Sequence, residues 1–382
     1  MRILVVSDLP QFVTGGAEMQ AARLIEAWLD AGHEVRCLGR RMGARSVRIG
    51  RHVLPVARIR TTSLLGRYGR AASYFLSLAW LLWRNRRWAQ VVYTRFLGEA
   101  AATAAILKAS GVLRLPLVAT PANTRGNGDI NLLRSLPLGG RLIGLLDREC
   151  DAINLIAADM VAELRAAGFS GRNFTRIPNG IRLAPPPARA QRDRPRFLAV
   201  GRLTPQKGYD VLLSALASMR EAFAPGQVRI VGDGPERDAL ASQAVALGVA
   251  DIVHWVGEAS QDVVVRCLDD ADVFLLPSRY EGLSNAGLEA MERALPLVLT
   301  RCGGLDHYVD PSVGWVVASE DASAFAGALA EALAATPARR ARMGLEARRR
   351  LEHEFDMAVV AARYAALFQA LHEGRPWPEP TA

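Results

Sequence analysis

Two basic side chains share one short loop in the second half of the chain. Arg202 and Lys207 stand five residues apart in the segment GRLTPQKG, residues 201–208, directly after an apolar run. A planar guanidinium and a compact ammonium placed together neutralise a diphosphate without a metal ion. The alternative is a pair of solvated surface cations. Lysine occurs only at Lys108 and Lys207 in this arginine-rich chain, which favours a specific use for the second one.

A second loop carries two glutamates eight residues apart. In the segment 277–291, PSRYEGLSNAGLEAM, Glu281 precedes a predicted helix start and Glu289 falls about one turn inside the helix. The amides near Ser284 and Asn285 are predicted to point at a phosphate, because a helix N-terminus offers N–H groups and partial positive charge. Glu289 would accept hydrogen bonds from a ribose diol, and Glu281 would hold sugar hydroxyls. The alternative for two such glutamates is ordinary surface charge.

Two glycine turns complete the set of candidate loops. Gly15 and Gly16 follow the first apolar run and precede a helical pattern, so their backbone can approach an anion. A plain strand-to-helix turn explains the same residues equally well. The turn with Gly232 and Gly234 is interpreted as structural, since glycine permits positive φ there.

The four loops require strands that end next to them. Short apolar runs alternate with helical patterns along the whole chain, which is typical of parallel sheets covered on both faces. We predict strands at 3–6, 34–38, 91–93, 117–119, 196–200, 228–231, 252–256, 273–276, 297–300 and 314–317. Each candidate loop follows one of these strands, at the carboxyl edge where doubly wound sheets bind ligands.

A proline-rich segment separates two such halves. Residues 183–195, LAPPPARAQRDRP, contain four prolines and no apolar periodicity, which indicates a linker. We therefore predict an α/β chain with two doubly wound, Rossmann-like domains. The boundaries are residues 1–187, residues 188–355 and a last helix over 356–382.

The motifs in this order resemble the retaining glycosyltransferases of the GT-B fold, glycosyltransferase family 4 (glycosyl transferases group 1). The resemblance covers nearly the whole chain. It rests on GGAE (15–18), IPNGI (177–181), GRLTPQKG (201–208), GDGPE (232–236), WVG (255–257), EGLSNAGLEAM (281–291) and CGG (302–304). It implies that residues 1–187 form the acceptor-side domain, that 188–355 bind a nucleotide sugar across a crevice, and that 356–382 cross back.

The resemblance also implies roles for individual residues. The catalytic candidates are Arg202, Lys207 and Glu281, with the first two on the donor diphosphate and the third on the donor sugar. The full donor-binding set is Gly15, Gly16, Arg202, Lys207, Glu281, Ser284, Asn285 and Glu289. Gly15 and Gly16 would close over the phosphates, and Glu289 would hold the ribose. No metal and no cofactor are expected.

Two positions depart from the family pattern. Many relatives carry a histidine in the loop after the fourth strand, near the donor sugar, but residues 117–129, LVATPANTRGNGD, contain none. Asn123, Thr124 and Arg125, with Thr120, are the polar residues predicted to take that acceptor-side position. In addition, Arg182 stands where relatives often have an acidic residue.

The charge is concentrated in the first half of the chain. Of the net +9, residues 1–187 carry +14 and residues 188–382 carry −5, and residues 35–98 hold 14 arginines with no Asp or Glu. The same segment holds the apolar run AASYFLSLAWLLW and three tryptophans. Arginines and indoles beside a short apolar helix favour contact with an anionic membrane surface. The alternatives are a buried helix in an arginine-rich protein and, more weakly, nucleic-acid binding, which we do not expect.

The composition excludes several other classes. With 50% hydrophobic and 22% charged residues the chain is not disordered. Four cysteines without a CxxC pair argue against a disulfide scaffold or a cysteine-rich zinc site, and favour the cytoplasm. The thirteen-residue apolar run is shorter than the roughly 20 residues that span a bilayer, and no secretory signal pattern opens the chain.

The predicted function is transfer of a sugar, with retention, from a nucleotide-diphosphate sugar to a glycan or lipid-linked acceptor. The setting would be cell-surface polysaccharide or lipopolysaccharide synthesis at the inner membrane face. A nucleotide-sugar epimerase, a phosphorylase of the same architecture and a silent nucleotide-sugar-binding subunit remain as alternatives.

Overall fold

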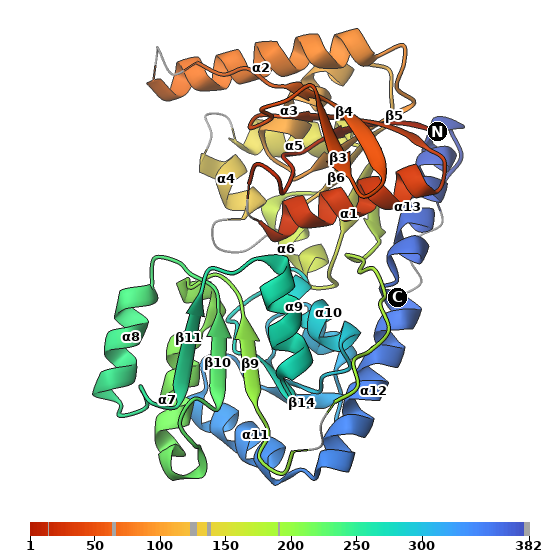
Figure 1. Cartoon of the computed structure of the whole chain (residues 1–382). Helices are drawn as coiled ribbons and strands as arrows, with labels where there is room; N and C mark the ends of the chain where they lie inside the picture. Colours follow the sequence, from red (N-terminus) through yellow and green to blue (C-terminus); the bar gives the residue numbers. More distant parts are fainter. Residues whose placement is uncertain (14, 63–65, 123–127, 136–138, 190–191, 378–382) are drawn as a thin grey trace. The chain divides into compact units, whose positions relative to one another are not determined.

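The computed structural model describes all residues except 14, 63–65, 123–127, 136–138, 190–191 and 378–382. The chain divides into two compact units, Met1–Arg182 with Met357–Ala382, and Leu183–Asp356. We call them unit 1 and unit 2 and describe each by itself (Figure 1).

Unit 1 is built on an eight-stranded sheet in the order β3-β4-β2-β1-β5-β6-β7-β8, parallel except for the β3–β4 hairpin. Its strands are β1 (Arg2–Val6), β2 (Glu34–Gly39), β3 (Ser46–Ile49), β4 (His52–Arg58), β5 (Val91–Arg95), β6 (Leu117–Thr120), β7 (Ala152–Leu155) and β8 (Phe174–Arg176). Its helices are α1 (Gly16–Asp30), α2 (Gly66–Asn85), α3 (Glu99–Ala109), α4 (Asp129–Ser135), α5 (Gly139–Glu149), α6 (Met160–Ala167) and α13 (Met357–His372).

An aromatic cluster attaches α13 to the rest of unit 1. Trp28 of α1 packs edge-on against Tyr93 and Tyr364, with ring centroids 5.5 and 5.9 Å away. Its indole Nε1 donates to the carbonyl of Ala361 at 3.1 Å. The last helix is therefore part of the core that also contains the central strands β1 and β5.

Unit 2 has a six-stranded parallel sheet in the order β11-β10-β9-β12-β13-β14. Its strands are β9 (Phe197–Val200), β10 (Val228–Val231), β11 (Val253–Gly257), β12 (Val273–Leu276), β13 (Leu297–Thr300) and β14 (Gly314–Val317). Its α-helices are α7 (Tyr209–Ser218), α8 (Arg237–Ala246), α9 (Gln261–Asp270), α10 (Asn285–Glu292), α11 (Ala322–Ala334) and α12 (Pro337–Glu354), with short 3₁₀ turns at Pro205–Lys207, Arg220–Ala222 and Leu305–Tyr308.

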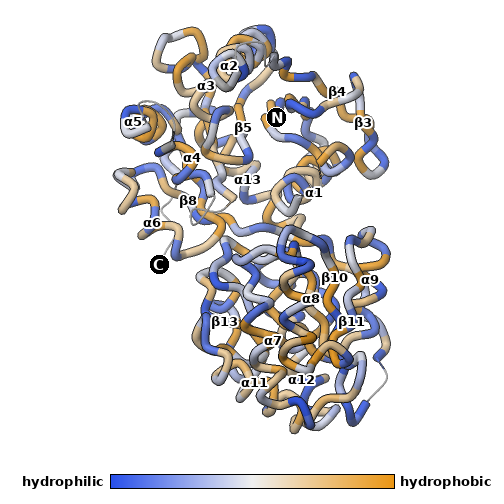
Figure 2. Tube along the Cα trace, turned by 90° about the vertical axis from the view of Figure 1, so that its left-hand side faces the viewer, coloured by the Kyte–Doolittle hydropathy of each residue, from blue (hydrophilic) through white to orange (hydrophobic). Residues whose placement is uncertain are grey.

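The apolar runs of unit 2 form strands because both faces of the sheet are covered. All four residues of β12 and of β13 are buried, as a parallel sheet between helices requires. The tube of Figure 2 shows hydrophobic residues along the sheet strands and α7. Helix starts carry local signals: Asp321 Oδ1 accepts from Ala324 N at 2.8 Å, and Thr336 caps α12 just before Pro337.

The prediction of two Rossmann-like α/β domains with parallel sheets is confirmed. The β3–β4 hairpin at the edge of the unit 1 sheet was not predicted. No helix in the described ranges has both the length and the apolar character to cross a membrane.

Candidate functional site

The strand order of unit 2 places two candidate loops side by side. β9 and β12 are neighbours in the sheet, although β10 and β11 separate them in the chain. The connections leave β9 and β12 toward opposite edges of the sheet, so the carboxyl ends of these two strands form its topological switch point, where such sheets bind ligands. Loop 201–208 follows β9, and loop 277–284 follows β12.

Lys207 and Glu281 meet across this switch point. The Lys207 ammonium forms an ion pair with Glu281 Oε1, and only 18% and 9% of the two side chains are exposed. Ser278 Oγ donates to the same carboxylate oxygen at 2.8 Å. The structure thus brings together two of the three predicted catalytic residues, and it pairs them with each other.

Arg279 connects the two loops through hydrogen bonds. The sequence did not single out this residue. Its guanidinium makes a two-pronged contact with Asp210, at 2.8 and 2.7 Å, and also donates to the carbonyl of Pro205 at 2.6 Å. Its backbone N–H donates to the carbonyl of Gln206 at 2.8 Å, and Gln206 Nε2 donates to the carbonyl of Tyr280 at 2.9 Å. The hydrogen bonds from Arg279 lower the pKa of the Asp210 carboxyl below its ordinary value.

Gly208 allows the two loops to approach this closely. Its φ is +64°, and a Cβ there would lie 2.1 Å from the carbonyl oxygen of Pro277. A side chain at this position would force the loops apart, and the left-handed backbone disfavours one as well. The glycine that ends the basic loop is therefore a structural requirement of the site.

The turn after β10 supports the basic loop from behind. Leu203 N–H donates to the carbonyl of Asp233 at 2.9 Å, and Glu236 N–H donates to the carbonyl of Leu203 at 3.1 Å. A Cβ on Gly232, whose φ is +137°, would lie 2.0 Å from the carbonyl oxygen of Gly201. Gly234 does not have the positive φ expected of it, but a Cβ there would lie 2.3 Å from the carbonyl oxygen of Leu203.

Arg202 and the start of α10 complete the switch point. The Arg202 side chain is exposed, in the loop that follows β9. Ser284 is the buried N-cap of α10, and its Oγ accepts from Gly287 N at 3.2 Å. Asn285 is the first residue of the helix, and Glu289 follows one turn later, half-buried. Two cations and a helix N-terminus suit phosphates, and two carboxylates suit hydroxyls.

Gly15 and Gly16 lie in unit 1, apart in the chain from the other donor-binding candidates. Gly15 is the N-cap of α1, and Gly16 is its first residue. The Glu18 carboxylate folds back over this turn, so a Cβ on Gly15 would lie 2.1 Å from Glu18 Oε2. Burial raises the pKa of Glu18 above its ordinary value. A carboxylate of the chain itself thus occupies the anion position at the start of α1.

A buried arginine lies at the end of β5, beside β1, where unit 1 has its own switch point. Arg95 is 2% exposed, and its Nη2 donates to Asn179 Oδ1 at 2.9 Å. Its Nε and Nη1 have no partner in the part of the chain that the structure describes. Burial raises the pKa of nearby Asp129 to about 7, although Ala122 N–H donates to it at 3.1 Å. The sequence could have indicated this buried arginine, because Arg95 ends the otherwise uncharged strand VVYTR.

Of the acceptor-side candidates, the structure describes Thr120. Asn123, Thr124 and Arg125 lie outside the described residues. Thr120 ends β6, is buried, and shares a 3.3 Å hydrogen bond with the hydroxyl of Tyr364. Among the described residues, no three His, Cys, Asp or Glu side chains gather into a metal site.

Family models and relatives match both halves of the chain. The Glycosyltransferase Family 4 model matches residues 14–185, and the Glycosyl transferases group 1 model matches residues 183–350.

The glycogen synthase of Mycobacterium tuberculosis is 32% identical over 242 residues, which are 62% of this chain and 58% of that protein. The GDP-mannose-dependent alpha-(1-6)-phosphatidylinositol monomannoside mannosyltransferase of Mycolicibacterium smegmatis is 30% identical over 259 residues, 63% of this chain and 68% of the relative. The putative colanic acid biosynthesis glycosyltransferase WcaL of Escherichia coli is 34% identical over 197 residues, 50% of this chain and 48% of the relative.

Solved structures match the chain along almost its full length. Sucrose-phosphate synthase from Thermosynechococcus elongatus superposes with a TM-score of 0.81, 19% identity and coverage of 98% of this chain and 99% of that one. Anabaena HepE, solved with UDP and glucose, gives a TM-score of 0.76 and 20% identity over 97% of this chain and 100% of that one. These likenesses establish the fold, which is that of GT-B glycosyltransferases.

Proposed function

We propose that this chain, which belongs to the family 4 and group 1 glycosyltransferases, transfers a sugar with retention from a nucleoside-diphosphate sugar to a glycan or lipid-linked acceptor. The observation that carries the proposal is the gathering of Arg202, Lys207, Glu281 and the N-terminus of α10 at the β9–β12 switch point. The solved neighbour HepE, with UDP and glucose bound, supports this class of donor.

The chemistry required of the site is stabilisation of a leaving diphosphate. In a retaining transfer without a protein nucleophile, the acceptor attacks from the face that the diphosphate leaves, and negative charge accumulates on the β-phosphate. Arg202, Lys207 and the first amides of α10 would stabilise that charge. The departing phosphate would take the proton of the acceptor hydroxyl. Glu281 would position the donor sugar and Glu289 the ribose.

The acceptor is proposed from the relatives and from charge. One relative is named for a phosphatidylinositol monomannoside, a lipid, and another for colanic acid, a polysaccharide. The acid-free, arginine-rich segment 35–98 suits an anionic membrane face. We therefore propose a peripheral enzyme of the inner membrane face that acts in cell-surface polysaccharide or lipopolysaccharide synthesis.

A donor screen tests the proposal first. Thermal unfolding with UDP-, GDP-, ADP- and TDP-sugars should show a rise in melting temperature with one nucleotide series, because a ligand that binds only the folded state stabilises it. Proton NMR of the product then reports the anomeric configuration. An inverted product would refute retention while leaving sugar transfer intact.

The alternatives differ in what they require. An epimerase would change the nucleotide sugar without an acceptor, so incubation with the donor alone reveals it. A phosphorylase would depend on inorganic phosphate. A silent subunit would bind the nucleotide sugar without turnover on any acceptor. The presence of Arg202, Lys207, Glu281 and Glu289 together favours an active transferase over this last alternative.

A further inference from the structure

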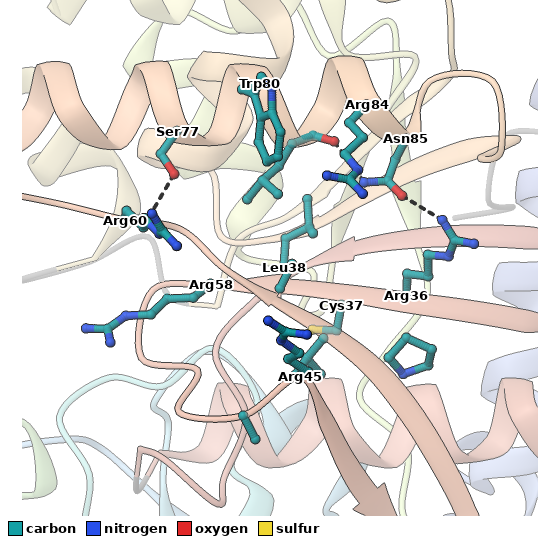
Figure 3. Close-up of a pocket in the computed structure, with 15 residues that line it drawn as sticks. Arg36, Cys37, Leu38, Arg45, Arg58, Arg60, Ser77, Trp80, Arg84 and Asn85 are labelled. Carbon is teal, nitrogen blue, oxygen red and sulfur yellow. Dashed lines mark hydrogen bonds between the residues drawn. The ribbon is translucent and has the colours of Figure 1, made fainter.

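Unit 1 contains a large cavity, and it is not lined by Arg95, Asn179 or Asp129 of the β1–β5 switch point. It measures about 900 Å³ and lies between α2 and the strands β2 and β4. Five arginines line it, together with apolar and neutral side chains. They are Arg36, Arg45, Arg58, Arg60 and Arg84. In Figure 3, Arg84 extends from α2, Arg36 and Arg58 belong to β2 and β4, and Arg45 and Arg60 lie just before β3 and just after β4.

The cavity has strong positive charge without internal compensation. No acidic residue among the described parts of the chain lines it, and none of the five arginines has an ion pair with a described residue. Arg36 is held by Asn85, whose Oδ1 accepts from Nη1 at 3.0 Å, and by the ring of Trp88, 4.0 Å from its Cζ. Like charges around one hollow favour an anion inside it, and several guanidinium groups suit a phosphate.

An exposed apolar ridge runs beside the cavity. Leu76, Trp80 and Trp83 are 67%, 52% and 48% exposed, and their i, i+4, i+7 spacing places them along one stripe of α2. Trp80 belongs to both features, because it also lines the cavity. Arginines accompany the indoles: the Cζ of Arg84 lies 5.3 Å from the Trp80 ring and that of Arg86 lies 4.4 Å from the Trp83 ring.

We propose that this cavity binds the phosphate-bearing headgroup of an anionic lipid while the ridge enters the apolar edge of the bilayer. Charge complementarity selects the phosphate, and the ridge selects a lipid over a soluble inorganic anion, which has no apolar part to contact it. The proposal deepens the membrane contact of the proposed function. It does not depend on glycosyl transfer, so binding measurements test it separately.

Vesicle flotation of the full chain tests the headgroup site. Binding to phosphatidylcholine vesicles should rise strongly when phosphatidylglycerol is included. Each arginine at such a surface contributes about fivefold in partitioning, so Arg45→Gln with Arg58→Gln should lower binding about 25-fold. Both side chains are exposed, so folding should be preserved. The matched control is Arg114→Gln with Arg141→Gln, which removes the same charge from exposed positions of unit 1 outside the cavity and should change binding little.

The ridge has its own variant. Leu76→Gln should lower binding to anionic vesicles roughly tenfold, because its side chain would no longer enter an apolar layer. Val245→Gln is the control, since Val245 of α8 is 69% exposed and belongs to unit 2.

Several results would overturn the proposal. Equal binding to neutral and anionic vesicles would show that no anionic headgroup is recognised. Equal losses of binding in the cavity variant and in its control would show that the cavity is not the binding site. If inorganic phosphate raised the melting temperature of the wild type but not of the cavity variant, while flotation was the same for both, the cavity would be a soluble-anion site. Loss of oligonucleotide binding in the cavity variant, with vesicle binding intact, would indicate a nucleic-acid surface. The nucleotide-sugar thermal shift should be unchanged in the cavity variant, which separates this proposal from the donor site.

Discussion

The Lys207–Glu281 pair allows stability and catalysis to be separated by a double-mutant cycle. Removing one partner of a buried ion pair costs roughly 3–5 kcal/mol, whereas an exposed pair contributes about 0–1 kcal/mol. With 18% and 9% of the side chains exposed, this pair lies near the buried limit, and we expect Lys207→Ala to cost roughly 2–4 kcal/mol. In a domain of about 150–250 residues that corresponds to a melting temperature lower by roughly 5–15 °C.

The second single variant and the double variant complete the cycle. Glu281→Gln should cost less than Lys207→Ala, because the ammonium left behind is the more exposed partner and Gln still accepts from Ser278. The double variant buries no unpaired charge, so it should be more stable than the sum of the single losses by roughly 1–3 kcal/mol. Urea unfolding of the four proteins measures this coupling. If the stability loss of the double variant equalled the sum of the two single losses within about 0.5 kcal/mol, the two side chains would not interact.

Activity should not follow the same pattern. Loss of a side chain that meets developing charge costs on the order of 10²–10³ in rate, so Lys207→Ala and the double variant should both be nearly inactive in transfer. Arg202→Ala is the matched control, because its exposed side chain contributes little to stability while its loss should also slow transfer. A Lys207→Ala protein that kept most of its activity would show that the phosphate assignment is wrong.

Three further variants test the supports of the two sites. Arg279→Lys cannot make the two-pronged contact with Asp210, whose side chain is 43% exposed, so we expect a loss of about 1 kcal/mol and a higher KM for the donor, measured by urea unfolding and donor titration. Gly208→Ala should cost more than about 1 kcal/mol and lower kcat/KM, because its Cβ would meet the Pro277 carbonyl, and an unchanged melting temperature would refute the close approach. Asp129 keeps its proton up to about pH 7 in the folded state but loses it near pH 4 when unfolded, so the free energy of unfolding should fall as pH rises between these values. Asp129→Asn should flatten that slope in urea unfolding at a series of pH values.

The elements of unit 2 were predictable because its parallel strands are short, fully apolar runs between glycine- and proline-marked turns. Val273–Leu276 and Leu297–Thr300 are examples, and both strands have the predicted bounds. The β3–β4 hairpin was not predicted because arginines and other exposed residues alternate with its buried side chains. Val47 and Ile49 of β3 are buried while Arg48 between them is exposed. The sequence of this segment therefore indicated its basic charge but not a strand.

The contacts within the site could not be predicted in the same way. Lys207 and Glu281 are 74 residues apart, and Asp210 and Arg279 are 69 apart, so no local pattern pairs them. Their meeting depends on β9 lying beside β12, a long-range consequence of the sheet order. The sequence therefore indicated which residue types gather at the switch point, but not that two of them form an ion pair with each other.

The structure also changes what the rarity of lysine means. Both lysines of the chain are mostly buried and paired with a carboxylate: Lys108 with Asp151 in unit 1, and Lys207 with Glu281 in unit 2. Rarity alone therefore indicates a place for a compact ammonium beside a carboxylate, and it does not by itself indicate a phosphate. The position of the lysine is what favours a phosphate, because of the two lysines only Lys207 lies at a switch point beside a helix N-terminus. An ammonium has no fixed plane of donors, so it can leave a carboxylate for a phosphate oxygen without the geometric demands of a guanidinium. A donor that brings both hydroxyls for Glu281 and a diphosphate for Lys207 compensates both partners at once, which is why a nucleotide sugar fits this pair better than a nucleotide alone.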